Sequence, residues 1–255
     1  GIASFIDDLT NGGDVVQTIT YRFTPHILPG DGGAECQNGI PVVLTVEIDP
    51  QPKITVTTDP ILCYDGDASF NISTVNTLVS SGGQWRYDVS AVVYPAGVTG
   101  TWAGGLTDQT SATLTDNLTN TSDVVQTVTY RFTPHILPGD GGAECQNGIP
   151  VVLTIEIDPQ PKIAVTTDPI LCYDGDAGFN ISTVNTALSS GGQWRYDVEI
   201  SYPANVTGTY GGPSGIVTVS NLAATGIASF TDDLTNNGDV VQTVTYRFTP
   251  HILPG

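Results

Sequence analysis

The sequence predicts an all-β protein in which β-sandwich units repeat in tandem and form an extended rod. Three observations carry this prediction. Apolar and polar residues alternate as they do in strands, one block of the sequence is repeated almost unchanged, and no segment has the period of a helix. The chain has 255 residues, 39% of them hydrophobic, which is enough apolar material for packed sheets.

The repeat determines how many units the chain contains. Residues 14–89 and 123–198 align over 76 positions (89 − 14 + 1) with six differences, mostly between small or aliphatic residues. Tyr21 recurs as Tyr130 and as Tyr246, so the two repeat lengths are 130 − 21 = 109 and 246 − 130 = 116 residues. Each length is typical of a domain that folds independently.

We therefore divide the chain into three parts. These are the C-terminal part of one unit (residues 1–50), a complete β-sandwich unit (51–159) and a unit that lacks its last strand (160–255). Because the chain starts and stops within units, we expect it to be a segment of a longer array. In the third part, the missing strand predicts an open sheet edge.

The first element of the repeated block is a half-buried strand over residues 17–24. Ile19, Tyr21 and Phe23 share one face, and threonines and an arginine share the other. Residues 42–48 alternate in the same way. We expect the two strands to pair as an antiparallel hairpin across a long loop rich in Gly, Pro and Asp.

The next element is the segment Asp49–Lys53, DPQPK, which returns at residues 158–162. Two prolines in five residues favour an extended, semi-rigid conformation. We place the boundaries between units at these two segments.

Further strands are expected over residues 54–58, 68–73 and 84–89, giving about seven short strands in each unit. Trp85, in the third of these segments, is expected to point inward, like the core tryptophan of immunoglobulin-like sandwiches. The two copies then diverge in sequence and length, as expected for a connection between strands.

The charge balance argues against a nucleic-acid partner. The chain has 26 acidic and 7 basic side chains and a net charge of −19, so it repels phosphate backbones. No run reaches the eighteen or more apolar residues of a membrane-spanning helix.

One pair of cysteines recurs in each copy, and it indicates an oxidising, extracellular environment. We prefer a disulfide between Cys63 and Cys145 within one unit, with Cys36 and Cys172 pairing outside this chain. Two alternatives stay open, namely disulfides between neighbouring units and free thiols.

Three groups of side chains are candidates for chemistry. The histidines of the repeated TPHILPG segment (His26, His135 and His251) are expected to be structural, and without a Ser-His-Asp order we expect no enzyme. Acidic side chains near glycines could bind Ca²⁺, with acidic surface turns as the alternative; they are Asp65, Asp67, Asp140, Glu144, Asp174 and Asp176. Trp102 and Tyr210 could stack on sugar rings, with core packing as the alternative.

Four features follow one another in the repeated block: the segment VTYRFTP, a Gly-rich loop with one cysteine, the segment PVVLTIEIDPQPK and a second cysteine. Together they resemble the PKD-like, immunoglobulin-fold repeats of giant surface proteins in Bacteroidetes. The near-identical copies are similar to those of gliding-motility adhesins. This resemblance covers the whole chain.

The resemblance implies a structural and adhesive role in a very long cell-surface filament associated with the outer membrane. The implied partners are neighbouring repeats, a surface polysaccharide or substratum, and the gliding and type IX secretion machinery. Carbohydrate-binding repeats of a secreted protein are the alternative. The expected cofactor is at most calcium.

Overall fold

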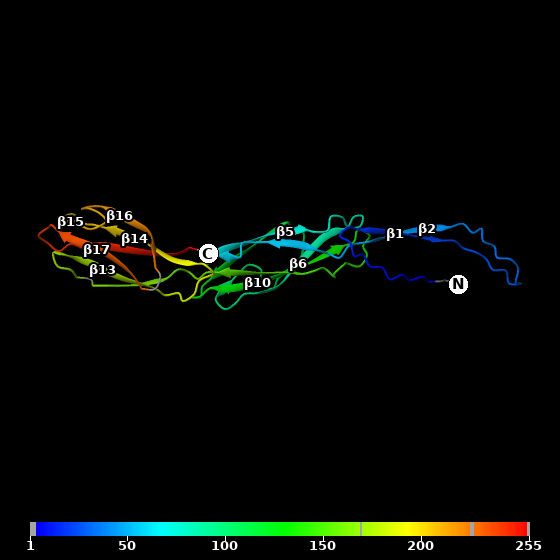
Figure 1. Ribbon diagram of the computed structural model, residues 1–255, viewed down its shortest axis with the longest axis horizontal. Helices are drawn as coiled ribbons and strands as arrows, with labels where there is room; N and C mark the ends of the chain where they lie inside the picture. The colour runs from blue at the N-terminus through cyan, green and yellow to red at the C-terminus, as the bar shows by residue number, and fades with distance from the viewer. Residues whose placement is uncertain (1–3, 169, 225–226, 254–255) are drawn as a thin grey trace.

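The computed structural model describes residues 4–168, 170–224 and 227–253, and every element in this part of the chain is a β-strand (Figure 1). No helix there could therefore cross a membrane. The strands of the first part and of the complete unit are β1 (Gln17–Phe23), β2 (Val42–Ile48), β3 (Ile54–Thr57), β4 (Ile61–Leu62), β5 (Asp65–Thr74), β6 (Gln84–Val93), β7 (Val98–Thr99), β8 (Leu106–Gln109), β9 (Thr113–Asn120), β10 (Gln126–Leu137) and β11 (Val151–Ile157). Those that follow are β12 (Ile163–Thr167), β13 (Asp174–Thr183), β14 (Gln193–Ser201), β15 (Val206–Thr207), β16 (Ile216–Ala223), β17 (Ile227–Asn236) and β18 (Thr245–Leu253).

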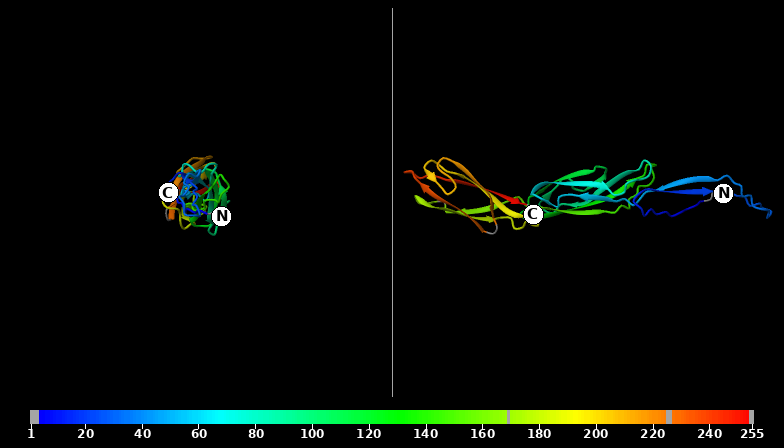
Figure 2. Two further views of the ribbon diagram at one scale, coloured as in Figure 1. Left: turned by 90° about the vertical axis from the view of Figure 1, so that its right-hand side faces the viewer. Right: turned by 45° about the horizontal axis from the view of Figure 1, so that its top comes forward.

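The complete unit is a sandwich of two sheets. One sheet has the strand order β3-β5-β9-β7 and the other β4-β11-β10-β6-β8. Figure 2 shows the two sheets running beside each other along the length of the unit. Because alternate residues of each strand point inward, the two inner faces supply one continuous core.

Aromatic rings fill the middle of this core. Phe70 on β5 contacts Tyr130 and Phe132 on β10, with ring centroids 4.8 and 5.2 Å apart. All three rings are buried, as is Ile155 of β11. The alternation predicted for the repeated hairpin is therefore confirmed in the complete unit, since Tyr130 and Phe132 are the copies of Tyr21 and Phe23.

A buried carboxylate organises the polar part of the core. Both Oδ atoms of Asp116 accept hydrogen bonds, Oδ1 from the backbone and hydroxyl of Thr101 (2.7 and 2.8 Å) and Oδ2 from the hydroxyls of Tyr94 and Tyr130 (2.7 and 2.8 Å). Burial, followed by the bond to Asp116, raises the pKa of Tyr130 far above its ordinary value. In the third part Asp232 accepts from Tyr202 and Tyr246 in the same way.

The predicted hairpin of residues 17–24 and 42–48 is confirmed, with β1 and β2 paired antiparallel from Gln17↔Ile48 to Phe23↔Val42. Its copy, β10 with β11, has the same register. Strand β10 nevertheless continues to Leu137, beyond the predicted end, because its C-terminal half pairs with β6 on the other side. The sequence of one strand could not show this second partner.

The third part repeats the first sheet as β12-β13-β17-β15, but its second sheet contains only β16-β14-β18. No strand of the described residues occupies the place that β11 takes beside β10, so the predicted open edge is present at β18. A cavity of about 690 Å³ lies there, lined by residues that include Phe179 and Tyr246.

Candidate functional site

The structure builds a polar junction where the complete unit meets the third part. Asp158, at the start of the linker, accepts hydrogen bonds from the backbone and the hydroxyl of Ser189 at 2.6 and 2.8 Å. The amide of Asn185 donates to Gln160 (3.0 Å) and its oxygen accepts from the Lys162 backbone (2.8 Å). Because Asp158, Asn185 and Ser189 are buried, these bonds are shielded from water.

The junction before the complete unit has the same construction. Ser80 donates twice to Asp49 at 2.5 and 2.8 Å, and Asn76 bonds the backbones of Gln51 and Lys53. Asn76 and Ser80 come from the loop after β5, and Asn185 and Ser189 come from the loop after β13; in both junctions this loop belongs to the unit that follows the linker. That loop closes onto the linker of the unit before it.

The first linker makes further backbone contacts with the following unit, and both linkers end in a lysine that pairs with an aspartate. The backbone oxygen of Pro52 accepts from Ile149 at 2.9 Å, and Gln51 donates to the backbone of Asn147 at 3.0 Å. The Lys53 ammonium lies 2.6 Å from Asp14, and Lys162 lies at the same distance from Asp123. The first linker is thus bonded to two loops of the next unit, and both linkers also pair with an aspartate of the unit before.

Four of the acidic residues predicted for calcium lie on strands, as two copies of one pair. Asp65 and Asp67 belong to β5, where they contact Thr119 (3.0 Å) and Asn117 of β9, so they lie on a paired strand. Their copies in β13 are Asp174 and Asp176. Among the described residues, neither pair joins a third ligand-type side chain in a group that could hold a metal ion.

The other two calcium candidates lie in the loop after β10. Asp140 accepts from the backbone of Gly142 at 2.9 Å and so stabilises its own turn. Glu144 instead approaches His135, at 3.2 Å.

The two aromatic candidates for sugar stacking take different positions. Trp102 is 7% exposed and packs against Phe70 and Tyr130, so it belongs to the core and no sugar ring can reach its face. This corrects the sugar-stacking prediction for Trp102. Tyr210 is 36% exposed and stacks on Phe230 with ring centroids 4.9 Å apart. Trp85, expected in the core, is half-buried.

The four cysteines Cys36, Cys63, Cys145 and Cys172 are free thiols in this structure, so the predicted Cys63–Cys145 disulfide is not formed. Its two members lie at different junctions. Cys63 lines a cavity of about 400 Å³ together with Asp158 and Ile252, toward the third part. Burial, then the nearby carboxylates of Asp49 and Glu144, raise the pKa of Cys145 at the other junction.

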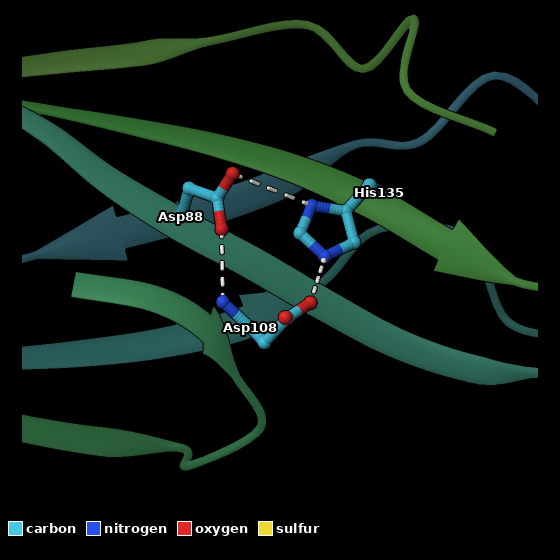
Figure 3. Close-up of side chains that lie close together, drawn as sticks. All are labelled: Asp88, Asp108 and His135. Carbon is cyan, nitrogen blue, oxygen red and sulfur yellow. Dashed lines mark hydrogen bonds and ion pairs between the residues drawn. The ribbon is translucent and has the colours of Figure 1, made fainter. Parts of the chain in front are cut away.

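A histidine and two aspartates meet on the five-stranded sheet of the complete unit (Figure 3). His135 of β10 lies opposite Arg86 of β6, and Asp88 follows two residues later on β6. Asp108 of β8 has a φ of 55°, and its backbone N–H donates to Asp88 at 2.9 Å. One ligand-type atom from each of the three lies within 4.8 Å of the others.

Carboxylates lie on both sides of the imidazole. His135 Nδ1 is 4.0 Å from Asp88 Oδ2, and Nε2 is 3.3 Å from Asp108 Oδ1 and 3.2 Å from Glu144 Oε1. The histidine is only 5% exposed, yet its Nε2 atom makes no hydrogen bond of acceptable geometry. Arg86 Nη1 approaches the same oxygen of Asp108 at 3.5 Å.

The repeated TPHILPG segment predicts a structural role for His135, and no sequence pattern singles out Asp88 or Asp108. The three residues are up to 135 − 88 = 47 positions apart, and only the register of β6, β8 and β10 brings them together. The signal that could point to Asp108 is its position shortly after Gly104 and Gly105 within the variable segment.

The fold and the core of the complete unit can now be compared with known families. Residues 63–161 match the family model of the PKD-like domain. No curated protein matches the chain. PKD-like domains typically occur in extracellular or surface proteins, where they act as structural or adhesive modules. The matched range covers most of the complete unit and ends within the second linker.

Proposed function

We propose that the chain is a structural and adhesive segment of a long filament on the cell surface, built from PKD-like units that follow one another as a rod. The observation that carries this proposal is the junction network. The same aspartate, serine and asparagine contacts occur at both junctions, around Asp49 and around Asp158. A contact set that recurs with the repeat is a property of the array.

A fixed junction has a mechanical consequence. A flexible linker would let neighbouring units rotate freely, whereas a linker bonded on two sides restrains the angle between them. Each unit then contacts mainly its neighbours, and a filament lengthens by adding copies. Weak contacts with a substratum, repeated on many copies, add up to firm attachment.

The residues also favour this role over the carbohydrate-binding alternative. The aromatic ring best suited to a sugar platform, Trp102, is in the core. The net charge of −19 gives a strongly solvated exterior, which suits a filament exposed to the medium. The resemblance of the repeats to those of gliding-motility adhesins extends the proposal to a filament that the type IX secretion system exports and the gliding machinery moves.

Electron microscopy of cells that produce the protein tests this function. Antibodies raised against residues 51–159 should label intact cells, with the label away from the envelope. A strain with an in-frame deletion of several units should carry its label closer to the envelope and attach less firmly to a surface. Labelling that requires permeabilised cells would contradict the proposal, as would attachment that is independent of the number of units.

A further inference from the structure

We propose that Asp108, His135 and Glu144 bind a divalent transition-metal ion of the Zn²⁺ type, and that Asp88 orients the histidine. The argument for this site does not depend on the filament proposal, and the loop that carries Glu144 continues to Cys145 at the first junction. It combines strands β8 and β10 with the loop that carries Glu144.

The first argument is the state of the imidazole. His135 Nε2 is buried and has no hydrogen-bond partner, although carboxylate oxygens lie 3.2 and 3.3 Å away. A buried polar atom without a partner is costly and calls for an explanation. Atoms that share a metal ion need no alignment with each other, because each points at the ion.

The second argument is distance. In a tetrahedral zinc site with bonds of about 2.0–2.1 Å, two ligand atoms lie about 3.3 Å apart. The separations of Nε2 from Asp108 Oδ1 and from Glu144 Oε1 are 3.3 and 3.2 Å. The carboxylates of Asp108 and Glu144 are therefore each spaced from His135 Nε2 as two ligands of one ion are.

The third argument is the carboxylate on the other side of the ring. Histidines that bind metals generally donate their second ring N–H to a carboxylate or carbonyl, which fixes the ring orientation. Asp88 Oδ2 lies on the Nδ1 side of His135 at 4.0 Å, as Figure 3 shows. Asp88 is itself held by the backbone N–H of Asp108.

The donor set selects the class of ion. An imidazole nitrogen suits Zn²⁺ and related transition metals, whereas Ca²⁺ and Mg²⁺ favour oxygen ligands alone. Asp108 is exposed, so an ion can enter from solvent. The Arg86 guanidinium, whose side chain is 27% exposed, lies 3.5 Å from the same Asp108 oxygen and would have to share it with the ion.

The other copies of this histidine offer internal comparisons. In the third part, His251 lies opposite Arg195, and Asp197 accepts from the Asn221 backbone at 2.7 Å. Asn221, with a φ of 62°, stands where Asp108 stands in the complete unit. An amide replaces the carboxylate there, so we expect one strong site in this chain.

Isothermal titration with Zn²⁺ tests the site on the whole chain. Because thiols also bind zinc, all four cysteines are first replaced by serine. We expect one Zn²⁺ per chain, and at least tenfold weaker binding in Asp108→Asn and Glu144→Gln. Asp88→Asn should weaken binding by about 10–100-fold, as loss of an orienting carboxylate does. Co²⁺ should give the intense visible absorption of a tetrahedral site.

Asp65→Asn is the matched control, because it removes one exposed carboxylate of the same unit outside the cluster. Its affinity for Zn²⁺ should equal that of the parent. Asp108→Asn copies the third part and should melt like the parent without metal, which separates binding from folding. Absence of saturable binding would overturn the proposal, and so would an Asp108→Asn variant that binds as tightly as the control.

Discussion

Asp116 receives the four hydrogen bonds on which the polar core of the complete unit depends. Its side chain is fully buried between the two sheets. A buried carboxylate is costly unless its oxygens are all paired, and here both oxygens are paired twice. The same arrangement around Asp232 indicates that the repeated sandwich depends on this aspartate.

Asp116→Ala should therefore destabilise the complete unit by about 2–4 kcal/mol, because it leaves the half-buried hydroxyl of Tyr94 and the buried hydroxyl of Tyr130 without this acceptor. Tyr130→Phe removes only one donor and should cost about 1 kcal/mol. Urea unfolding followed by circular dichroism measures both. Asp67→Ala, at an exposed position, serves as the control and should stay within about 0.5 kcal/mol. Equal effects of Asp116→Ala and Asp67→Ala would contradict this role.

At the scale of elements, the sequence predicted the strands better than their partners. Alternation in residues 17–24 and 42–48 was sufficient for the hairpin, since strand period and pairing of neighbours are local properties. It could not give the pairing of β10 with β6, nor reveal that Asp65 begins a strand, since both depend on a distant partner. The same limit concealed the cluster at His135, which three strands and a loop assemble.

The junction is the element on which the mechanical proposal depends. Small-angle X-ray scattering of the chain should give a maximum dimension that Ca²⁺ and its chelator EGTA leave unchanged, because the junction hydrogen bonds join protein groups directly. The double variant Asp158→Ala and Asn185→Ala removes the bonds to Ser189 and to the linker backbone. We expect broader conformational sampling and a less extended average particle.

The control for that experiment is Asp168→Ala, an exposed aspartate outside the junction network. It should scatter like the parent. An unchanged profile for the double variant would show that the junction bonds do not set the angle between units. A smaller maximum dimension in EGTA would instead indicate that calcium stabilises the junctions.

For the whole molecule, the positions of the cysteines favour pairing between units over the pairing within one unit that the sequence led us to prefer. The backbones of Ile136 and Cys145 form an isolated antiparallel β-bridge. Ile252 is the copy of Ile136, and it lines the same cavity as Cys63. A cysteine placed opposite Ile252 would thus enter the cavity that holds Cys63. The sequence could not show this, since it fixes no distance between the poles of a sandwich.

This geometry can be tested by appending a copy of residues 140–162 to Gly255, which completes the third unit with the sequence of the second. The copied β11 should pair with β18 and fill the cavity of about 690 Å³, raising the melting temperature of that unit. The copied cysteine should approach Cys63 closely enough for a disulfide, which requires Cα atoms within about 7 Å. Peptide mapping without reductant identifies the bond.

In the extended chain, Cys63→Ser should abolish the new disulfide. Cys172→Ser should leave it intact, because Cys172 is the copy of Cys63 in the third unit and lies at the far end of that unit. A bond between Cys63 and Cys145 would refute pairing across the junction. A bond across it would close a covalent loop around the linker and add to the hydrogen bonds there. Filaments made of such units would then resist pulling through covalent connections at every junction, and reductant should lower the force at which the junctions open.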